Sequence, residues 1–179
     1  MMSTMKSGMI YLIGSMGAGK STIGQLLAKE LGLSFADTDK EIEARCGADI
    51  SWIFDVEGEE GFRKRETTVL RDLSQQTAQI IATGGGTVMT PENRQIIRDG
   101  GFVVFLDAAV DTLIRRMEKD RCRPLLQRPD RNDVIKDLHV ERDPVYRELA
   151  DLIVLTSRES PRLVVKKIID TLNQYLPRL

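Results

Sequence analysis

The amino-acid sequence predicts an α/β protein of three layers, in which helices cover both faces of a central sheet of five parallel strands. Two observations support this fold class. Short apolar runs rich in β-branched residues alternate with segments of helical periodicity, and such unbroken runs are typical of strands buried on both faces. Glycine-rich or acidic segments follow these runs, at the strand ends where parallel sheets bind their ligands.

The strands are expected in five apolar runs, at residues 9–13, 33–37, 79–83, 102–107 and 152–156. After the first run, apolar residues at helical spacing predict a helix that ends at Gly32, a natural C-cap. Thr90 as N-cap and Pro91 at the first helical position predict a helix that stops at Gly100. The last helix is expected to begin at Ser160, with an apolar face made of Val165, Ile168, Ile169, Leu172 and Leu176.

Length, charge and cysteine content narrow the possible classes of protein. A chain of 179 residues fits one domain, and 26 basic against 27 acidic residues argue against a wholesale nucleic-acid binder. Cys46 and Cys122 form no CxxC pair, which disfavours zinc and favours free thiols in a reducing cytosol. The first apolar run is too short for a signal sequence or a membrane span. We therefore expect a cytoplasmic monomer with no nucleic-acid or membrane partner.

The segment GSMGAGKST follows the first predicted strand and fits the pattern GxxxxGK[ST], with Gly14, Gly19, Lys20 and Ser21 at the fixed positions. Glycines allow successive backbone N–H groups to turn inward around phosphate oxygens, and the following helix offers its positive N-terminal end. Lys20 is expected to contact the β- and γ-phosphates, and Ser21 to bind Mg²⁺. The segment therefore predicts a site for a nucleoside triphosphate.

Asp37 and Asp39 flank one threonine at the end of the second predicted strand. In an extended strand alternate side chains point the same way, so the two carboxylates are expected to face a common site. A triphosphate site of this kind needs a carboxylate near Mg²⁺, and both Asp37 and Asp107, at the end of the fourth strand, are candidates. Their spacing does not choose between them. The alternative interpretation is that both aspartates of the pair only cap a helix.

Six motifs occur in a fixed order along the chain: GSMGAGKSTIG, DTD, IFDVEGEEGFRKRE, TGGG, RPLL and RDPVYRELA. Together they closely resemble the shikimate kinases, a small group of P-loop proteins similar to the nucleoside-monophosphate kinases. The resemblance extends from about Met9 to the last helix. It implies a P-loop NTPase fold, a single kinase domain spanning 1–179, a substrate-binding segment at about 37–66 and a lid at about 116–131. It also implies transfer of the γ-phosphoryl group of MgATP to the 3-hydroxyl of shikimate, in the chorismate pathway.

The resemblance assigns separate roles to the acidic residues. Asp37 is expected near Mg²⁺ through a bound water, whereas Asp39 is expected to hydrogen-bond the hydroxyl that is phosphorylated and to act as base or orienter. Asp107 then resembles a strand-end residue. Arg123, in RPLL, is the expected lid arginine that stabilises charge on the transferred group, so Lys20, Asp39 and Arg123 form the expected catalytic set.

Two arginines are expected to bind the carboxylate of the substrate, because a guanidinium group matches a carboxylate bidentately. The resemblance places this role on Arg63 and Arg142, and leaves Arg65 and Arg147 solvated or paired locally. Glu66 lies one helical turn after Arg63 and could hold its guanidinium group in place.

Gly84, Gly85 and Gly86 follow the third predicted strand. Three consecutive glycines lose much conformational entropy on folding, and the simplest justification is close approach of backbone N–H groups to a ligand. A flexible turn is the alternative. The resemblance places Gly85 between the substrate and the γ-phosphate. Phe54 and Phe62 resemble the aromatic walls of the pocket, although the sequence alone indicates only core positions.

The expected nucleotide-binding residues are Gly17, Ala18, Gly19, Lys20, Ser21, Thr22, Arg116, Arg123 and Arg158. Arg116 and the stretch around Arg158 and Pro161 are expected to pack on adenine. His139 is the only histidine and lies outside every motif, so it is expected to be structural or exposed.

Two other functions fit parts of the pattern. Another small-metabolite kinase, such as gluconate kinase, would share the P-loop but lack the DTD, GFR and RDPVY motifs. A nucleotide-binding regulator without catalytic activity predicts loss of Lys20, Asp39 or Arg123, and all three are present.

Overall fold

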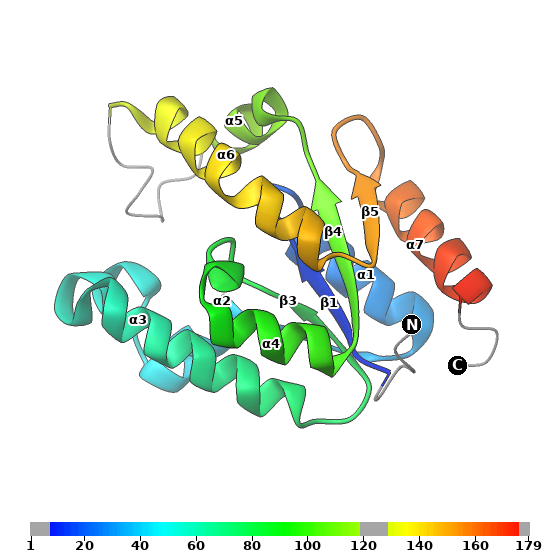
Figure 1. Ribbon diagram of the computed structural model, residues 1–179, viewed down its shortest axis with the longest axis horizontal. Coiled ribbons are helices and arrows are strands. Elements are labelled where there is room, and N and C mark those ends of the chain that lie inside the picture. The colour runs from blue at the N-terminus through cyan, green and yellow to red at the C-terminus, as the bar shows by residue number, and fades with distance from the viewer. Residues whose placement is uncertain (1–7, 119–128, 176–179) are drawn as a thin grey trace.

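The computed structural model describes residues 8–118 and 129–175. Within these ranges, five strands form one parallel sheet in the order β2-β3-β1-β4-β5 (Figure 1). The strands are β1 (Ile10–Ile13), β2 (Ser34–Asp37), β3 (Gln79–Ala82), β4 (Phe102–Asp107) and β5 (Leu152–Leu155). All five expected strands are therefore confirmed, each within about a residue of its predicted ends.

The described helices are α1 (Lys20–Leu31), α2 (Thr38–Cys46), α3 (Ile50–Ser74), α4 (Pro91–Gly100), α5 (Val110–Met117), α6 (Arg131–Leu149) and α7 (Pro161–Tyr175), with a 3₁₀ turn at η1 (Thr87–Met89). In Figure 1, α1 and α7 lie on one face of the sheet, while α4 and α6 cross the other. The predicted three-layer α/β/α architecture around a five-stranded parallel sheet is thus confirmed.

The predicted helix ends are mostly confirmed. Gly32 adopts the left-handed conformation after α1, with φ 66°, and its N–H donates to the carbonyl of Ala28. Pro91 begins α4, but Thr90 occupies the N-cap position without a side-chain cap hydrogen bond. Ser160 precedes α7 and its hydroxyl accepts from the N–H of Leu163.

Two apolar cores flank the sheet, and β1 contributes to both. Ile10 and Leu12 face the core shared with α1 and α7, whereas Tyr11 and Ile13 face the core shared with α3, α4 and α6. Because side chains alternate along a strand, a run of consecutive apolar residues fills both layers at once. This explains why the unbroken apolar pattern of the sequence predicted the layers correctly.

None of the helices in residues 8–118 and 129–175 is long and apolar enough to cross a membrane.

Tyr146 of α6 contacts both the sheet and the loop after β3. Its ring stacks on Phe105 of β4, with 5.0 Å between ring centroids. Its hydroxyl donates a 2.5 Å hydrogen bond to the carbonyl oxygen of Gly85. Burial raises the pKa of Tyr146 to about 12, because the anion would lose its hydration in the core.

This raised pKa predicts a loss of stability at alkaline pH. Above pH 10.0, the ordinary pKa of a tyrosine side chain, the unfolded chain ionises this residue while the folded chain keeps it neutral up to about pH 12. The free energy of unfolding should therefore fall by about 2–3 kcal/mol across that interval from this residue alone. Denaturant titrations of the wild type and of Tyr146→Phe, at a series of pH values, should show a shallower decline for the variant. An equally steep decline would contradict the assignment.

Candidate active site

The loop between β1 and α1 has the backbone that its glycines predict. Gly14, Gly17 and Gly19 have φ values of 143°, 80° and 98°, which side-chain-bearing residues rarely adopt. Gly19 is the N-cap of α1, so the first N–H groups of that helix open onto the loop. Ala18 lies within the loop, and Thr22 lies in the first turn of α1. This geometry suits a phosphate group.

Lys20 lies over the same loop. Its ammonium group donates to the carbonyl oxygens of Gly14 and Ser15, at 2.7 and 2.9 Å. These contacts hold the positive charge beside the loop, where the sequence pattern predicts the β- and γ-phosphates.

Asp37 forms hydrogen bonds both with the P-loop, the segment at residues 14–22, and with the first turn of α2. Its Oδ2 accepts a 2.5 Å hydrogen bond from the hydroxyl of Ser21, and its Oδ1 accepts from the backbone N–H groups of Asp39 and Lys40, at 3.0 and 3.3 Å. One carboxylate oxygen therefore caps α2 and the other faces the P-loop serine. The capping interpretation is correct for Asp37, but it accounts for only one of the two carboxylate oxygens.

The expectation that Asp37 and Asp39 alternate along one extended strand is wrong. The strand β2 ends at Asp37 and α2 begins at Thr38, so Asp39 lies in the first turn of a helix. The two side chains consequently point to different neighbours. The Oδ1 atom of Asp39 lies only 2.8 Å from the position that a Cβ on Gly84 would occupy. Asp39 therefore lies against residues 84–86, here called the glycine loop.

The other candidate for the metal site, Asp107, is occupied by an ion pair. Its carboxylate accepts a 2.8 Å hydrogen bond from Arg147, which also donates to Asp143 at 2.7 Å. The pKa of Arg147 is raised by these two carboxylates, first by Asp143 and then by Asp107. The structure thus pairs Ser21 with Asp37, and Asp107 with Arg147. The expected local pairing of Arg147 is confirmed.

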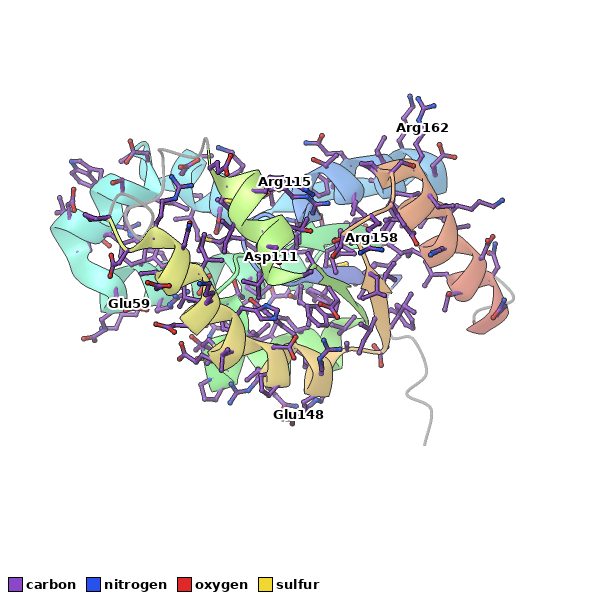
Figure 2. The ribbon with its side chains drawn as sticks, turned by 90° about the horizontal axis from the view of Figure 1, so that it is seen from above. Glu59, Asp111, Arg115, Glu148, Arg158 and Arg162 are labelled. Atoms are coloured by element: carbon purple, nitrogen blue, oxygen red, sulfur yellow. The ribbon has the colours of Figure 1, made fainter. Side chains whose placement is uncertain are left out.

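Arg63 is held by acidic residues of its own helix. It donates to Glu66 at 2.8 Å and to Glu59 at 3.3 Å, and its guanidinium group lies 5.3 Å from the centre of the Phe62 ring. Figure 2 shows Glu59 at the end of the molecule opposite α7. The predicted contact between Arg63 and Glu66 is confirmed. Phe62 in turn packs on Phe54, at 4.7 Å between ring centroids.

Thr87 was not expected to contribute to the site. Glu66 is fully buried, and its second carboxylate oxygen accepts a 2.6 Å hydrogen bond from the Thr87 hydroxyl. Glu66 thereby links Arg63 to the turn after the glycines. The residues lie 21 positions apart in the sequence, so no local pattern could have predicted this contact.

Arg65 is also paired, as predicted. Two of its nitrogens donate to the two carboxylate oxygens of Glu57, at 2.7 and 2.6 Å. Gly58 lies between them in the sequence and interrupts the helical backbone of α3 with φ 70°. The ion pair spans this kink, which separates the first turns of α3 from the part that carries Arg63.

Space, and not backbone conformation, favours glycine at Gly84 and Gly86, where a Cβ would displace side chains of the site. None of them has a positive φ. A Cβ on Gly86 would lie 2.4 Å from Nη2 of Arg63, and a Cβ on Gly84 would lie 3.0 Å from Oε1 of Glu66. A flexible turn does not explain such crowding. The loop is instead packed against the proposed substrate-binding side chains.

The expectation that these glycines direct their N–H groups to a ligand is wrong for Gly84. Its N–H donates to the hydroxyl of Thr38, at 3.0 Å. Gly85 lies between two parts of the site, because a Cβ there would be 3.4 Å from both Nη1 of Arg142 and the backbone nitrogen of Met16. It therefore separates the P-loop from an arginine of α6.

Arg142 is the most buried arginine in residues 8–118 and 129–175, with 8% of its surface exposed. Its Nε atom has no hydrogen-bond partner among the described residues. Within the same part of the chain, no carboxylate forms an ion pair with Arg142. A buried guanidinium group without a carboxylate is costly, and an anionic ligand would offset that cost.

Arg116 stabilises the P-loop from the outside. It donates to the carbonyl oxygens of Gly17 and Thr156, at 3.0 and 2.8 Å. Arg158 is exposed, and Figure 2 shows it on the loop from β5 to α7, with Arg115 on α5. Contact of Arg116 and Arg158 with adenine stays a prediction. Arg123 and most of the expected lid at 116–131 lie outside the described residues.

The site resembles a phosphoryl-transfer centre in its parts. A phosphate-binding loop, a hydroxyl–carboxylate pair and a carboxylate facing a glycine loop lie at the ends of β1, β2 and β3. No group of three or more His, Cys, Asp or Glu side chains that could hold a metal occurs in the part of the chain that the structure describes. Any cation here would have few protein ligands, which suits Mg²⁺ bound together with phosphates and water.

Comparison with known proteins agrees with this geometry. A model of the shikimate kinase family matches residues 16–173. A shikimate kinase of Pseudomonas aeruginosa strain LESB58 is 56% identical over 169 residues, covering 94% of this chain and 98% of that protein. A shikimate kinase of Chromohalobacter salexigens is 58% identical over 160 residues, covering 89% of each.

Solved structures show the same likeness. The shikimate kinase from Acinetobacter baumannii in complex with shikimate is 42% identical, has a TM-score of 0.93 and is matched over 97% of both chains. A sugar kinase from Janibacter sp. HTCC2649 is 18% identical with a TM-score of 0.57, and that likeness shows the fold alone. The family match over most of the length, together with relatives above half identity, establishes that this chain belongs to the shikimate kinase family.

Proposed function

We propose that this chain transfers the γ-phosphoryl group of ATP to the 3-hydroxyl of shikimate, giving 3-phosphoshikimate and ADP. The observation that carries the proposal is the placement of Arg63 and Arg142 beside adjacent glycines of the same loop. A Cβ on Gly86 would meet Arg63, and a Cβ on Gly85 would lie near Arg142. Two guanidinium groups beside the glycine loop suit a small acceptor that carries a carboxylate.

In this proposal the acceptor lies against the glycine loop at residues 84–86, between the two arginines. Arg63 and Arg142 bind its carboxylate and so fix the orientation of the ring. Asp39 then orients the reacting hydroxyl and accepts its proton as the oxygen attacks the γ-phosphorus. The bond from that phosphorus to the oxygen it shares with the β-phosphate breaks, and ADP leaves. Catalysis is mainly positioning and stabilisation of charge.

In this proposal the P-loop binds the nucleotide. Its backbone N–H groups and Lys20 bind the phosphates, while Arg116 keeps the loop attached to the end of β5. Substrate-binding residues in the segment 37–66 and a lid at 116–131 complete the proposed kinase domain. Arg123 would lie in that lid, and its catalytic role stays a prediction.

The residues near Ser21 fit a magnesium ion. The hydroxyl of Ser21 and a carboxylate oxygen of Asp37 already lie 2.5 Å apart, and both are the oxygen ligands that Mg²⁺ prefers. We propose that Ser21 binds the ion directly and that Asp37 binds it through water. When bound, the ion would neutralise part of the phosphate charge. The monomeric state and the cytoplasmic location expected from the sequence also stay predictions.

The proposed reaction is tested by measuring ADP release with MgATP and shikimate, gluconate or no acceptor. ADP release that depends on shikimate, with 3-phosphoshikimate as product, would support it. The same slow ADP release with every acceptor would rule out the kinase reaction on shikimate and favour an ATPase or a nucleotide-binding regulator.

Asp39→Asn should reduce kcat by about 10²- to 10⁴-fold, the range typical of a lost general base. The amide can still donate a hydrogen bond but cannot accept the proton. Asp99→Asn, at an exposed position of α4, provides the control and should leave the rate unchanged. A near-normal rate for Asp39→Asn would remove the residue from the catalytic set.

Asp37→Asn and Asp107→Asn should differ in their response to Mg²⁺. Asp37→Asn should raise the Mg²⁺ concentration needed for half-maximal rate by about tenfold, as for other groups that position a metal. Asp107→Asn should leave that concentration unchanged but lower the unfolding temperature, because Arg147 loses a partner. The reverse pattern would transfer the metal role to Asp107.

Thr87→Val should weaken substrate binding without contacting the substrate. The variant keeps the shape of the side chain but leaves an oxygen of buried Glu66 without its donor. Such a loss costs about 1–3 kcal/mol, so the unfolding temperature should fall and KM for shikimate should rise more than KM for ATP. Thr87→Ser retains the hydroxyl and should restore most of both values. If Ser and Val behave alike, the hydroxyl has no role in holding Arg63.

A further inference from the structure

Three buried polar atoms of α6 have no hydrogen-bond partner in residues 8–118 and 129–175: Nδ1 of His139, Nε of Arg142 and Oδ1 of Asp143. The carboxylate of Asp143 is already paired with Arg147 through its other oxygen, which leaves His139 and Arg142 as the side chains to explain. The two residues are three positions apart in one helix, so their side chains share a face. Buried polar groups of this kind are rare, and a water molecule is a common partner for them.

Both side chains line the same small cavity. Its other walls are Ser15 and Met16 of the P-loop, with Ile135 and Leu138 of α6, and its volume is about 10 Å³. A cavity of about this size accommodates one water molecule. The two residues that carry the unpartnered atoms therefore share one cavity, which has room for about one water molecule.

The two atoms have complementary hydrogen-bonding roles. The Nε–H group of Arg142 can only donate, whereas Nδ1 of a neutral histidine accepts when the ring proton is on Nε2. A water molecule between them would accept from Arg142 and donate to His139. This arrangement satisfies both atoms and assigns the tautomer of the imidazole.

We propose that His139, acting through one ordered water molecule, is a positioning residue for Arg142. The water occupies the Nε edge of the guanidinium group, so a ligand meets the terminal nitrogens, while the guanidinium group also interacts with Tyr146. Nη1 already lies beside Gly85, on the side of the glycine loop. The substrate carboxylate is then bound by the two terminal nitrogens and not by the Nε edge. This inference rests on the proposed role of Arg142 in binding the substrate.

The first test is spectroscopic and independent of activity. His139 is the only histidine in the chain, so the ¹⁵N resonances of histidine report on this ring alone. The neutral ring should carry its proton on Nε2, with Nδ1 showing the shift of a hydrogen-bond acceptor, and Arg142→Lys should abolish that shift. A crystal structure of the free protein should show one water within hydrogen-bond distance of both atoms. A ring protonated at Nδ1, or no water there, would overturn the proposal.

The second test separates hydrogen bonding from packing. Asparagine places its side-chain oxygen near the position of Nδ1, whereas leucine fills similar space without an acceptor. His139→Leu should raise KM for shikimate by about tenfold, the effect of losing a hydrogen bond that orients a charged group, with kcat and KM for ATP unchanged. His139→Asn should remain close to the wild type.

Equal increases in KM for the Leu and Asn variants would indicate a packing role and overturn the proposal, as would no increase for Leu. If Leu fails to fold, His139→Gln, whose oxygen lies one carbon further out, takes its place and should show the same rise in KM. A wild-type protein that does not phosphorylate shikimate would refute the proposed function instead, and the spectroscopic result would still decide whether His139 and Arg142 share a water.

Discussion

The parallel pairing of β3 with both β1 and β2 is the constraint on which the site depends. Parallel strands end at the same edge of a sheet, so the P-loop, Asp37 and the glycine loop emerge side by side although about 70 residues separate the first from the last. The apolar side chains that hold these strands in register lie in two separate cores. The positions of Lys20, Asp37 and Asp39 are thus fixed by rigid elements and not by the loops alone.

The acidic residues at this edge fall into two groups, those paired with an arginine and those that face a loop of the site. Asp107 is neutralised by Arg147, and Glu66 is neutralised by Arg63, so these buried carboxylates are structural. Asp37 instead accepts from the P-loop serine, and Asp39 lies against the glycine loop, so each is near a loop that faces the site. Like charges at close range repel, and the first turn of α2 reduces this repulsion by directing the two carboxylates to different neighbours.

The sequence predicted the layers, the five strands and the P-loop, because these features depend on local periodicity and on glycine at fixed positions. It also predicted the contact between Arg63 and Glu66, which are one helical turn apart. The prediction that Asp39 continues an extended strand was wrong, because β2 ends at Asp37 and α2 begins at Thr38. The contacts of Thr87 with Glu66 and of Tyr146 with Gly85 join distant segments, so no local signal could have indicated them.

Arg142 shows how the fold and the proposed chemistry oppose each other. Burying a guanidinium group without a carboxylate destabilises the free protein, whereas replacing it with an apolar residue would relieve that cost. Arg142 lies beside Gly85 and the P-loop, where its guanidinium group is already largely desolvated. A carboxylate that binds there would therefore not have to displace the water around the cation. Ligand binding would then stabilise the folded chain as well as orient the acceptor. The cost of burying Arg142 in the free protein and the affinity for the substrate would then have the same physical origin.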